Sequence, residues 1–110
     1  MAIISNLVID QGSTFTADID VTDRYGNVLG LSGYTAAGQI RKTYTSSTSV
    51  AFTTNIATPS TGVVSIALSS SQTGIMKPGR YVYDVEITSA DNQVTRIVEG
   101  QVEITPSVTR

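Results

Sequence analysis

The densest group of carboxylates in the sequence comprises Asp18, Asp20 and Asp23, and Asn27 follows them closely. Carboxylate and amide oxygens are the ligands that Ca²⁺ prefers, so calcium binding is one chemistry that this group could support. The spacing matches no EF-hand loop. Alternation puts Asp18 and Asp20 on the outer face of a strand, where carboxylates are ordinarily hydrated. We therefore expect no metal site, and a calcium-dependent shift in melting temperature would be the evidence for one.

A second pair of carboxylates, Asp84 and Glu86, could support acid–base catalysis of the kind that glycosidases use. Those enzymes hold their carboxylates in a cleft beside aromatic side chains that stack on the sugar. Here the aromatic residues of the same strand, Tyr81 and Tyr83, alternate to the opposite face. The sequence instead favours cross-strand pairing of the two acids with basic residues. The candidates for that pairing are Arg96, Arg80 and Lys42.

The composition argues against an enzyme. The 110 residues include no His and no Cys, which removes the commonest general base, the commonest metal ligand and any thiol nucleophile. No serine lies in a G-x-S-x-G context, and the isolated glycines Gly12, Gly26 and Gly30 form no phosphate-binding loop. We predict a non-enzymatic protein without catalytic residues, cofactor-binding residues or metal ligands.

Charge and hydropathy also limit the partners. The formal net charge of −2 does not favour binding to a nucleic-acid backbone, and no apolar run approaches the roughly 18 residues of a membrane span. We expect neither partner. Arg41, Lys42 and Tyr44 could form a basic and aromatic binding patch, but the sequence favours the charged end of an edge strand, because such charges discourage pairing with other chains.

The strand that carries Asp84 and Glu86 is the clearest in the chain. Its sequence over 77–88, KPGRYVYDVEIT, alternates with a period of two, which is typical of a strand buried on one face. We expect the inward residues to be Tyr81, Tyr83, Val85 and Ile87. A tyrosine near the start of a late strand of a β-sandwich can turn its hydroxyl back to the backbone across a corner. Either tyrosine of this strand could make that bond.

The rest of the chain reads as further strands separated by turns. We expect strands over 6–10, 13–22, 34–43, 49–56, 63–69 and 94–105, with 28–31 as a short edge strand or a connector. Gly38 predicts a bulge or a close backbone approach. In the last strand, Val94 begins an inward face that Arg96 interrupts, and Gly100 predicts a bulge or bend. Residues 70–76 predict one helical turn, capped by Ser69 or Ser70, with Ile75 and Met76 beneath it.

Seven or eight strands at a spacing of about 10–12 residues predict an all-β fold. We expect one antiparallel β-sandwich of the immunoglobulin-like kind, with a small barrel as the alternative. The length predicts a single domain over 1–110. Within it, residues 1–5 form a possible partner-binding N-terminal segment, and residues 106–110 form a tail.

Four stretches together resemble a family of phage proteins: LVIDQGSTFTADIDVTD, GNVLGLSGYTAAGQIRKTY, SSSQTGIMKPGRYVYDVEI and RIVEGQVEITPSVTR. They are similar to immunoglobulin-like modules of tailed-phage virion structural proteins. These include the N-terminal domain of siphophage baseplate upper proteins and small structural proteins of cyanobacterial myophages. The resemblance covers residues 7–110, and its most specific parts are PGRYVYDVEI and RIVEG. It marks a scaffold, so it transfers no functional residue.

The resemblance implies a non-catalytic accessory module located in a phage virion. Such a module would decorate or cement the head, or belong to the tail or baseplate. Its partners would be other virion subunits, bound as a homo-oligomer or on a symmetric lattice through turn tips, an edge strand or the N-terminal segment. The alternative is a carbohydrate- or host-receptor-binding module of a head or tail fibre, which would use exposed aromatics such as Tyr25, Tyr34 or Tyr44.

Overall fold

The computed structural model describes residues 3–23 and 25–108. Their elements in chain order are β1 (Ile3–Ile4), β2 (Leu7–Asp10), β3 (Phe15–Asp20), β4 (Thr35–Arg41), β5 (Val50–Ala51), β6 (Thr53–Asn55), the 3₁₀ turn η1 (Pro59–Thr61), β7 (Val63–Leu68), α1 (Ser70–Gly74), β8 (Gly79–Thr88) and β9 (Val94–Thr105). Within the described residues, no helix is both long and apolar enough to span a membrane.

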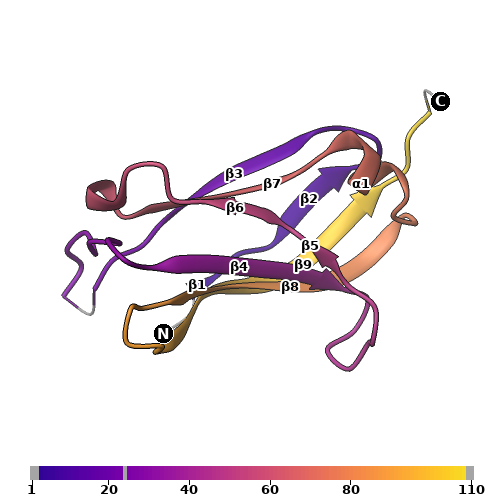
Figure 1. Cartoon of the computed structure of the whole chain (residues 1–110). Coiled ribbons are helices and arrows are strands. Elements are labelled where there is room, and N and C mark those ends of the chain that lie inside the picture. Colours follow the sequence, from indigo (N-terminus) through magenta and orange to yellow (C-terminus); the bar gives the residue numbers. More distant parts are fainter. Residues whose placement is uncertain (1–2, 24, 109–110) are drawn as a thin grey trace.

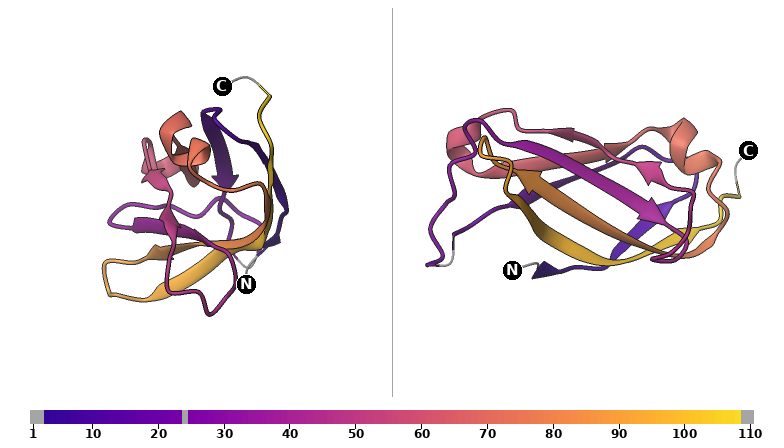
Figure 2. Two further views of the ribbon diagram at one scale, coloured as in Figure 1. Left: turned by 90° about the vertical axis from the view of Figure 1, so that its right-hand side faces the viewer. Right: turned by 60° about the horizontal axis from the view of Figure 1, so that its bottom comes forward.

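The strands form two sheets that pack face to face, which confirms the predicted all-β sandwich (Figures 1 and 2). The larger sheet has the order β1-β9-β8-β4-β5, with β2 also paired to β9, and the smaller sheet has the order β3-β7-β6. In immunoglobulin terms, β3, β7 and β6 occupy the B, E and D positions, while β4, β8 and β9 occupy C, F and G. The loops from β3 to β4 and from β8 to β9 lie at one end, with β1, and α1 lies at the other (Figure 1).

The sandwich differs from the predicted antiparallel arrangement at one edge. Both β1 and β2 pair with β9 in parallel. The predicted inward face of β2 is correct, because Ile9 is buried and Leu7 is half-buried. Alternation identifies the buried face of a strand but not the strand with which it pairs. The sequence pattern therefore could not predict the parallel pairing with β9, which is distant in the chain.

The alternation in β8 is confirmed, whereas that in β9 is shifted by a bulge. Val85 pairs with Val98 but Glu86 pairs with Arg96, so Ile97 is the extra residue on β9. The bulge reverses the faces on its two sides. As a result Arg96 and Val94 both point outward, and the prediction that Val94 lies on the inward face was wrong. The bulge is at Ile97 and not at Gly100.

The predicted strand over 49–56 is divided between the sheets. β5 pairs with β4 of the larger sheet, and β6 pairs with β7 of the smaller one. Phe52 lies at the crossing, where its side chain is 6% exposed and its N–H donates to the Gly38 carbonyl at 2.9 Å. Thr54, which breaks the apolar phase, is half-buried and donates its hydroxyl to the Ala36 carbonyl at 2.8 Å.

β4 lies inside the larger sheet, between β8 and β5, so the prediction that its charged end protects an edge strand was wrong. Gly38 shows the predicted close approach. A Cβ at this position would lie 3.0 Å from the Asp84 carbonyl oxygen and from atoms of Phe52 and Val85. The absence of a side chain therefore lets Phe52 cross closely over β4.

The predicted helical turn is present as α1. The Ser69 hydroxyl accepts from the Gln72 amide, and the Gln72 side chain accepts in return from the Ser69 amide. This capping box defines the start of the helix. Met76 is buried beneath the turn as predicted, but Ile75 is 81% exposed, so its predicted burial was wrong.

Candidate functional site

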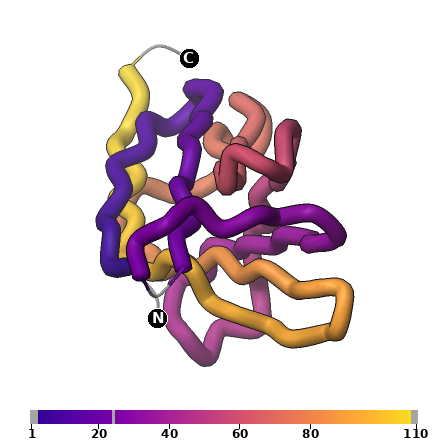
Figure 3. Tube along the Cα trace, turned by 90° about the vertical axis from the view of Figure 1, so that its left-hand side faces the viewer, coloured from indigo at the N-terminus to yellow at the C-terminus, as the bar shows by residue number. Residues whose placement is uncertain are grey.

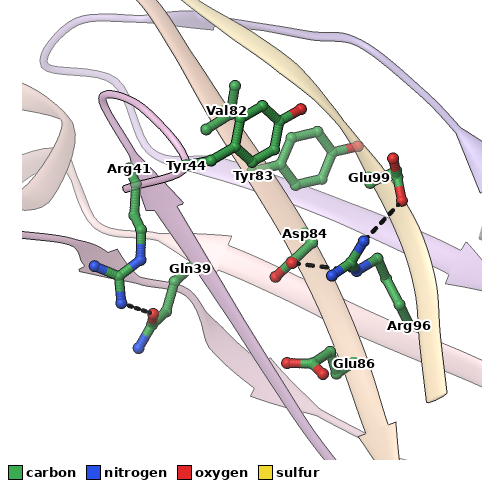
Figure 4. A pocket seen from close by; sticks show the side chains of 9 residues that line it. All are labelled: Gln39, Arg41, Tyr44, Val82, Tyr83, Asp84, Glu86, Arg96 and Glu99. Carbon is green, nitrogen blue, oxygen red and sulfur yellow. Dashed lines mark hydrogen bonds and ion pairs between the residues drawn. The ribbon is translucent and has the colours of Figure 1, made fainter. Parts of the chain in front are cut away.

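Asp84 and Glu86 lie on the outer face of the larger sheet, where β4, β8 and β9 run side by side (Figure 4). Arg96 forms ion pairs with Asp84 at 3.3 Å and with Glu99 at 3.2 Å. The hydrogen bond to Glu99, followed by the charge of Asp84, raises the pKa of Arg96 above its usual value. Glu86 lies directly opposite Arg96 in the register. The predicted cross-strand pairing of Asp84 with a basic residue is therefore confirmed, and that residue is Arg96.

These charged residues line an open hollow of about 270 Å³ in the sheet surface (Figure 4). Arg41 forms the opposite wall, where it donates to Gln39 Oε1 at 2.9 Å and to the Ser46 carbonyl at 2.6 Å. The second bond fastens the loop after β4 to the end of that strand. The loop carries Tyr44, which is 79% exposed, to the same hollow. The hollow thus combines one aromatic ring with carboxylate, amide and guanidinium groups.

The sequence pattern missed Tyr44 as a neighbour of the acids. Tyr81 and Tyr83 do alternate away from Asp84, but Tyr44 arrives from a loop that has no periodicity to interpret. The proposed patch of Arg41, Lys42 and Tyr44 is not assembled as a unit. Lys42 instead donates to the Arg80 carbonyl at 3.0 Å, with its Nζ 4.7 Å from the Tyr81 ring centroid.

Two of the three aspartates considered as calcium ligands accept hydrogen bonds from other residues of the fold. Asp23 Oδ1 accepts from the amides of Tyr25 at 2.8 Å and Asn27 at 3.0 Å, which stabilises the turn after β3. Asp18 accepts from the Ser65 hydroxyl at 2.8 Å across the sheet. Within residues 3–23 and 25–108, no group of three or more His, Cys, Asp or Glu could hold a metal ion. Arg24, inside the predicted turn, lies outside the described residues.

Tyr81 makes the predicted corner bond. Its hydroxyl donates to the Lys77 carbonyl at 2.7 Å, across the bend that leads from α1 into β8. This is the geometry of the tyrosine corner of immunoglobulin-like sandwiches. The bond therefore stabilises the connection through which the chain passes from α1 into β8 of the larger sheet.

We expect Tyr81→Phe to lower the free energy of unfolding by about 1 kcal/mol, because it removes one hydrogen bond and preserves the ring. Denaturant unfolding measures this loss as a lower midpoint. Tyr44→Phe is the matched control, since the described residues provide no hydrogen bond to the exposed Tyr44 hydroxyl. Equal midpoints for the Tyr81 variant and the parent would contradict a stabilising corner bond.

Tyr83 ties the N-terminal segment to the core. Its hydroxyl donates to the Ser5 carbonyl at 2.6 Å, and Ile3 and Ile4 pair with β9. The predicted partner-binding segment 1–5 is therefore attached to its own sandwich through residues 3–5, while Met1 and Ala2 lie outside the described residues. Residues 109–110 of the predicted tail lie outside them too.

Burial raises the pKa of the Tyr83 phenol above its ordinary value of 10.0. The folded state therefore holds this proton more tightly than the unfolded state. The resulting stability is full below the unfolded pKa and is lost as the pH rises through the folded pKa. We expect the difference in unfolding free energy between the parent and Tyr83→Phe to shrink from about pH 9 upward. A difference that stays constant in urea titrations at rising pH would contradict this.

A second surface lies at the end of the sandwich that holds β1 and the loop from β3 to β4. Tyr25 is 76% exposed there, and Ile3, Ile4 and Val28 are each more than half exposed. Ile3 also lines a groove of about 390 Å³ between β1 and the end of β3. We call it the seam groove; its lining includes the apolar residues Ile3, Val21, Leu29 and Ile97 and the acidic residues Asp20 and Asp23. Figure 3 views the molecule from this end.

No protein-family model and no curated protein sequence matches this chain. Similar solved structures include the internalin-like protein lmo2027 of Listeria monocytogenes, with a TM-score of 0.47 and 18% identity over 96% of this chain and 28% of that chain. A family 123 glycoside hydrolase from Clostridium perfringens has a TM-score of 0.44 and 13% identity over 97% of this chain and 24% of that chain. This chain thus spans about a quarter of the length of either structure. Likeness at this level carries no argument about function.

Proposed function

We propose that this chain is a non-catalytic structural module of a bacteriophage virion that binds other virion subunits. It would decorate the head or form part of the tail or baseplate. The phage assignment is supported by the resemblance of PGRYVYDVEI and RIVEG to virion modules. In this fold those stretches form β8 and the first half of β9, together with the tyrosine corner. What is similar is therefore a scaffold, and binding is expected elsewhere on the surface.

The observation that carries the proposal is the apolar character of the end surface. Tyr25 and Val28, in the loop from β3 to β4, and Ile3, which lines the seam groove, are large hydrophobic side chains that the described structure leaves mostly exposed. Exposed apolar residues that gather at one end of a soluble protein mark interaction sites. The outer face of the larger sheet differs, because Arg96 already forms ion pairs with Asp84 and Glu99 there. A stable contact needs about 800 Å² from each partner.

Mass spectrometry of purified and washed phage particles tests the proposal. We expect the chain in many copies per particle, as a lattice-bound module requires. A cryo-EM map should then show the end that holds Tyr25 and Val28 facing a neighbouring subunit. Absence of the chain from washed particles would refute the proposal. Its presence with the outer face of β4, β8 and β9 against the partner would refute the assigned surface.

A second candidate function, carbohydrate binding, is supported by the hollow that Tyr44 borders. An exposed ring can stack on a sugar, and Glu86, which accepts no hydrogen bond from the described residues, can accept bonds from sugar hydroxyls. Of the other aromatics proposed for this role, Tyr25 lies at the opposite end and Tyr34 is half-buried. A glycan array probed with the parent and Tyr44→Ala distinguishes the two functions. Binding that needs Tyr44 would support this candidate, and an array without hits would reject it.

A further inference from the structure

The smaller sheet has an open edge along β3. β3 pairs with β7 on one side and with no described strand on the other. In immunoglobulin sandwiches that bear an A strand, this strand extends the sheet beside B. Here β1 and β2 both pair with β9 in the other sheet. The position beside β3 is therefore unfilled within the part of the chain that the structure describes.

The backbone groups at this edge can be identified. The Val21 N–H donates to the Gly62 carbonyl at 2.7 Å, on the side of β7. Residues of a strand direct their N–H and C=O alternately to its two sides. Thr16, Asp18 and Asp20 therefore direct theirs to the open side. β3 contains no Pro and its register with β7 has no bulge, so it lacks two common means of blocking an edge, and its charged side chains, Asp18 and Asp20, are both acidic.

The seam groove lies below the end of this edge. Ile3 pairs with Val98, and paired residues share a face of the sheet. Val98 is 5% exposed whereas Ile3 is 59% exposed, although both side chains face the interior. Core-facing apolar atoms thus remain uncovered at the point where an added strand would cover them.

We propose that an extended segment of a neighbouring subunit adds to β3 as a further strand, and this inference rests on the proposed subunit-binding function. Its N–H and C=O groups would bond those of Thr16, Asp18 and Asp20. Alternate apolar side chains of the segment would enter the seam groove and cover Ile3. This is recognition by strand addition, in which the backbone supplies affinity and alternate side chains supply specificity.

The chemistry of the segment follows from the charges at the edge. Asp18 and Asp20 project from the outer face of β3, and Asp20 and Asp23 line the seam groove. No Lys or Arg is among the described residues that line it. Cross-strand neighbours of opposite charge stabilise a sheet. The segment therefore alternates apolar residues on its inner face with Lys, Arg or neutral polar residues on its outer face.

Selection of a random 12-residue peptide library against the isolated chain tests this inference. We expect the enriched peptides to alternate apolar with basic or polar residues. One of the enriched peptides, prepared by synthesis, should slow hydrogen exchange at the amides of Thr16, Asp18 and Asp20 at least tenfold when it binds. Thr16→Pro should weaken its binding at least tenfold, because proline removes an edge N–H and its ring obstructs pairing. Thr16→Ala keeps the amide and should bind as the parent does.

Asp20→Lys is a second variant that leaves the backbone intact, and it is used if Thr16→Pro does not fold. We expect Asp20→Lys to weaken the binding of a basic peptide about tenfold. The inference is overturned if no peptide is enriched, if protection falls on other strands, or if both variants bind as tightly as the parent. These outcomes are separate from the particle test. If the chain is present in virions but binds no such peptide, only strand addition is rejected. If it binds the peptide through β3 but is absent from virions, only the virion assignment is rejected.

Discussion

Replacement of Phe52 by alanine is expected to lower the free energy of unfolding by about 4 kcal/mol, since large-to-small changes at buried aromatics cost this much. Phe52 lies where the chain crosses from β5 in one sheet to β6 in the other. Its ring meets Phe15 at a centroid distance of 6.4 Å and Tyr83 at 6.0 Å in an edge-on geometry. The side chain therefore joins both sheets, and its removal leaves a cavity between them.

The matched control for Phe52→Ala is Tyr44→Ala, which removes an aromatic ring of similar size from an exposed site. Surface changes of this kind are usually within about 0.5 kcal/mol of the parent. Urea unfolding followed by circular dichroism measures both variants. If the two alanine variants unfolded at the same midpoint, Phe52 could not be the joint between the sheets. A variant that keeps its unfolding midpoint and loses only the hydrogen-exchange protection of β5 and β6 would also contradict this role.

The sequence predicts the fold best where one face of a strand is fully buried. In β8, Tyr83, Val85 and Ile87 are all buried as the alternation requires. A shift of one residue would expose this whole set, so burial specifies the register strongly. The bulge in β9 leaves a visible trace, because the adjacent residues Ile97 and Val98 are both buried. Two consecutive inward residues after the exposed Arg96 are the signal that identifies such a bulge.

The surface features were less predictable. Pairing of Asp84 with a base follows from its outward position, but the choice of Arg96 depends on the order of the strands in the sheet. Tyr44 reaches the hollow through a loop held by Arg41, and neither propensity nor periodicity describes such a loop. The open edge of β3 results from where the N-terminal strands pair. Parallel pairing to β9 is a contact between distant parts of the chain, which a local pattern does not encode.

Gly100 shows how the N-terminal strand depends on a single position of β9. A Cβ added there would lie 2.2 Å from the Ser5 carbonyl oxygen, well inside van der Waals contact. Ser5 is held in place on both sides, because its N–H donates to the Glu99 carbonyl and its own carbonyl accepts from Tyr83. Asn6 Oδ1 also accepts from the Gln101 amide at 3.0 Å. The bend between β1 and β2 therefore requires glycine at position 100.

We expect Gly100→Ala to lower the free energy of unfolding by about 3 kcal/mol, the upper range for forced overpacking. The backbone bend must move, so the bond from Tyr83 to Ser5 and the pairing of β1 are lost together. Gly30→Ala is the matched control, because a Cβ there meets no atom within 4 Å. Denaturant unfolding and hydrogen exchange at Ile3–Ser5 measure the two effects. If Gly100→Ala were as stable as Gly30→Ala, with β1 still protected, the bend at Ser5 would be free to adapt. Retained stability with β1 released would instead mean that the N-terminal strand contributes little to the sandwich and that Ile3 is not a fixed wall of the seam groove.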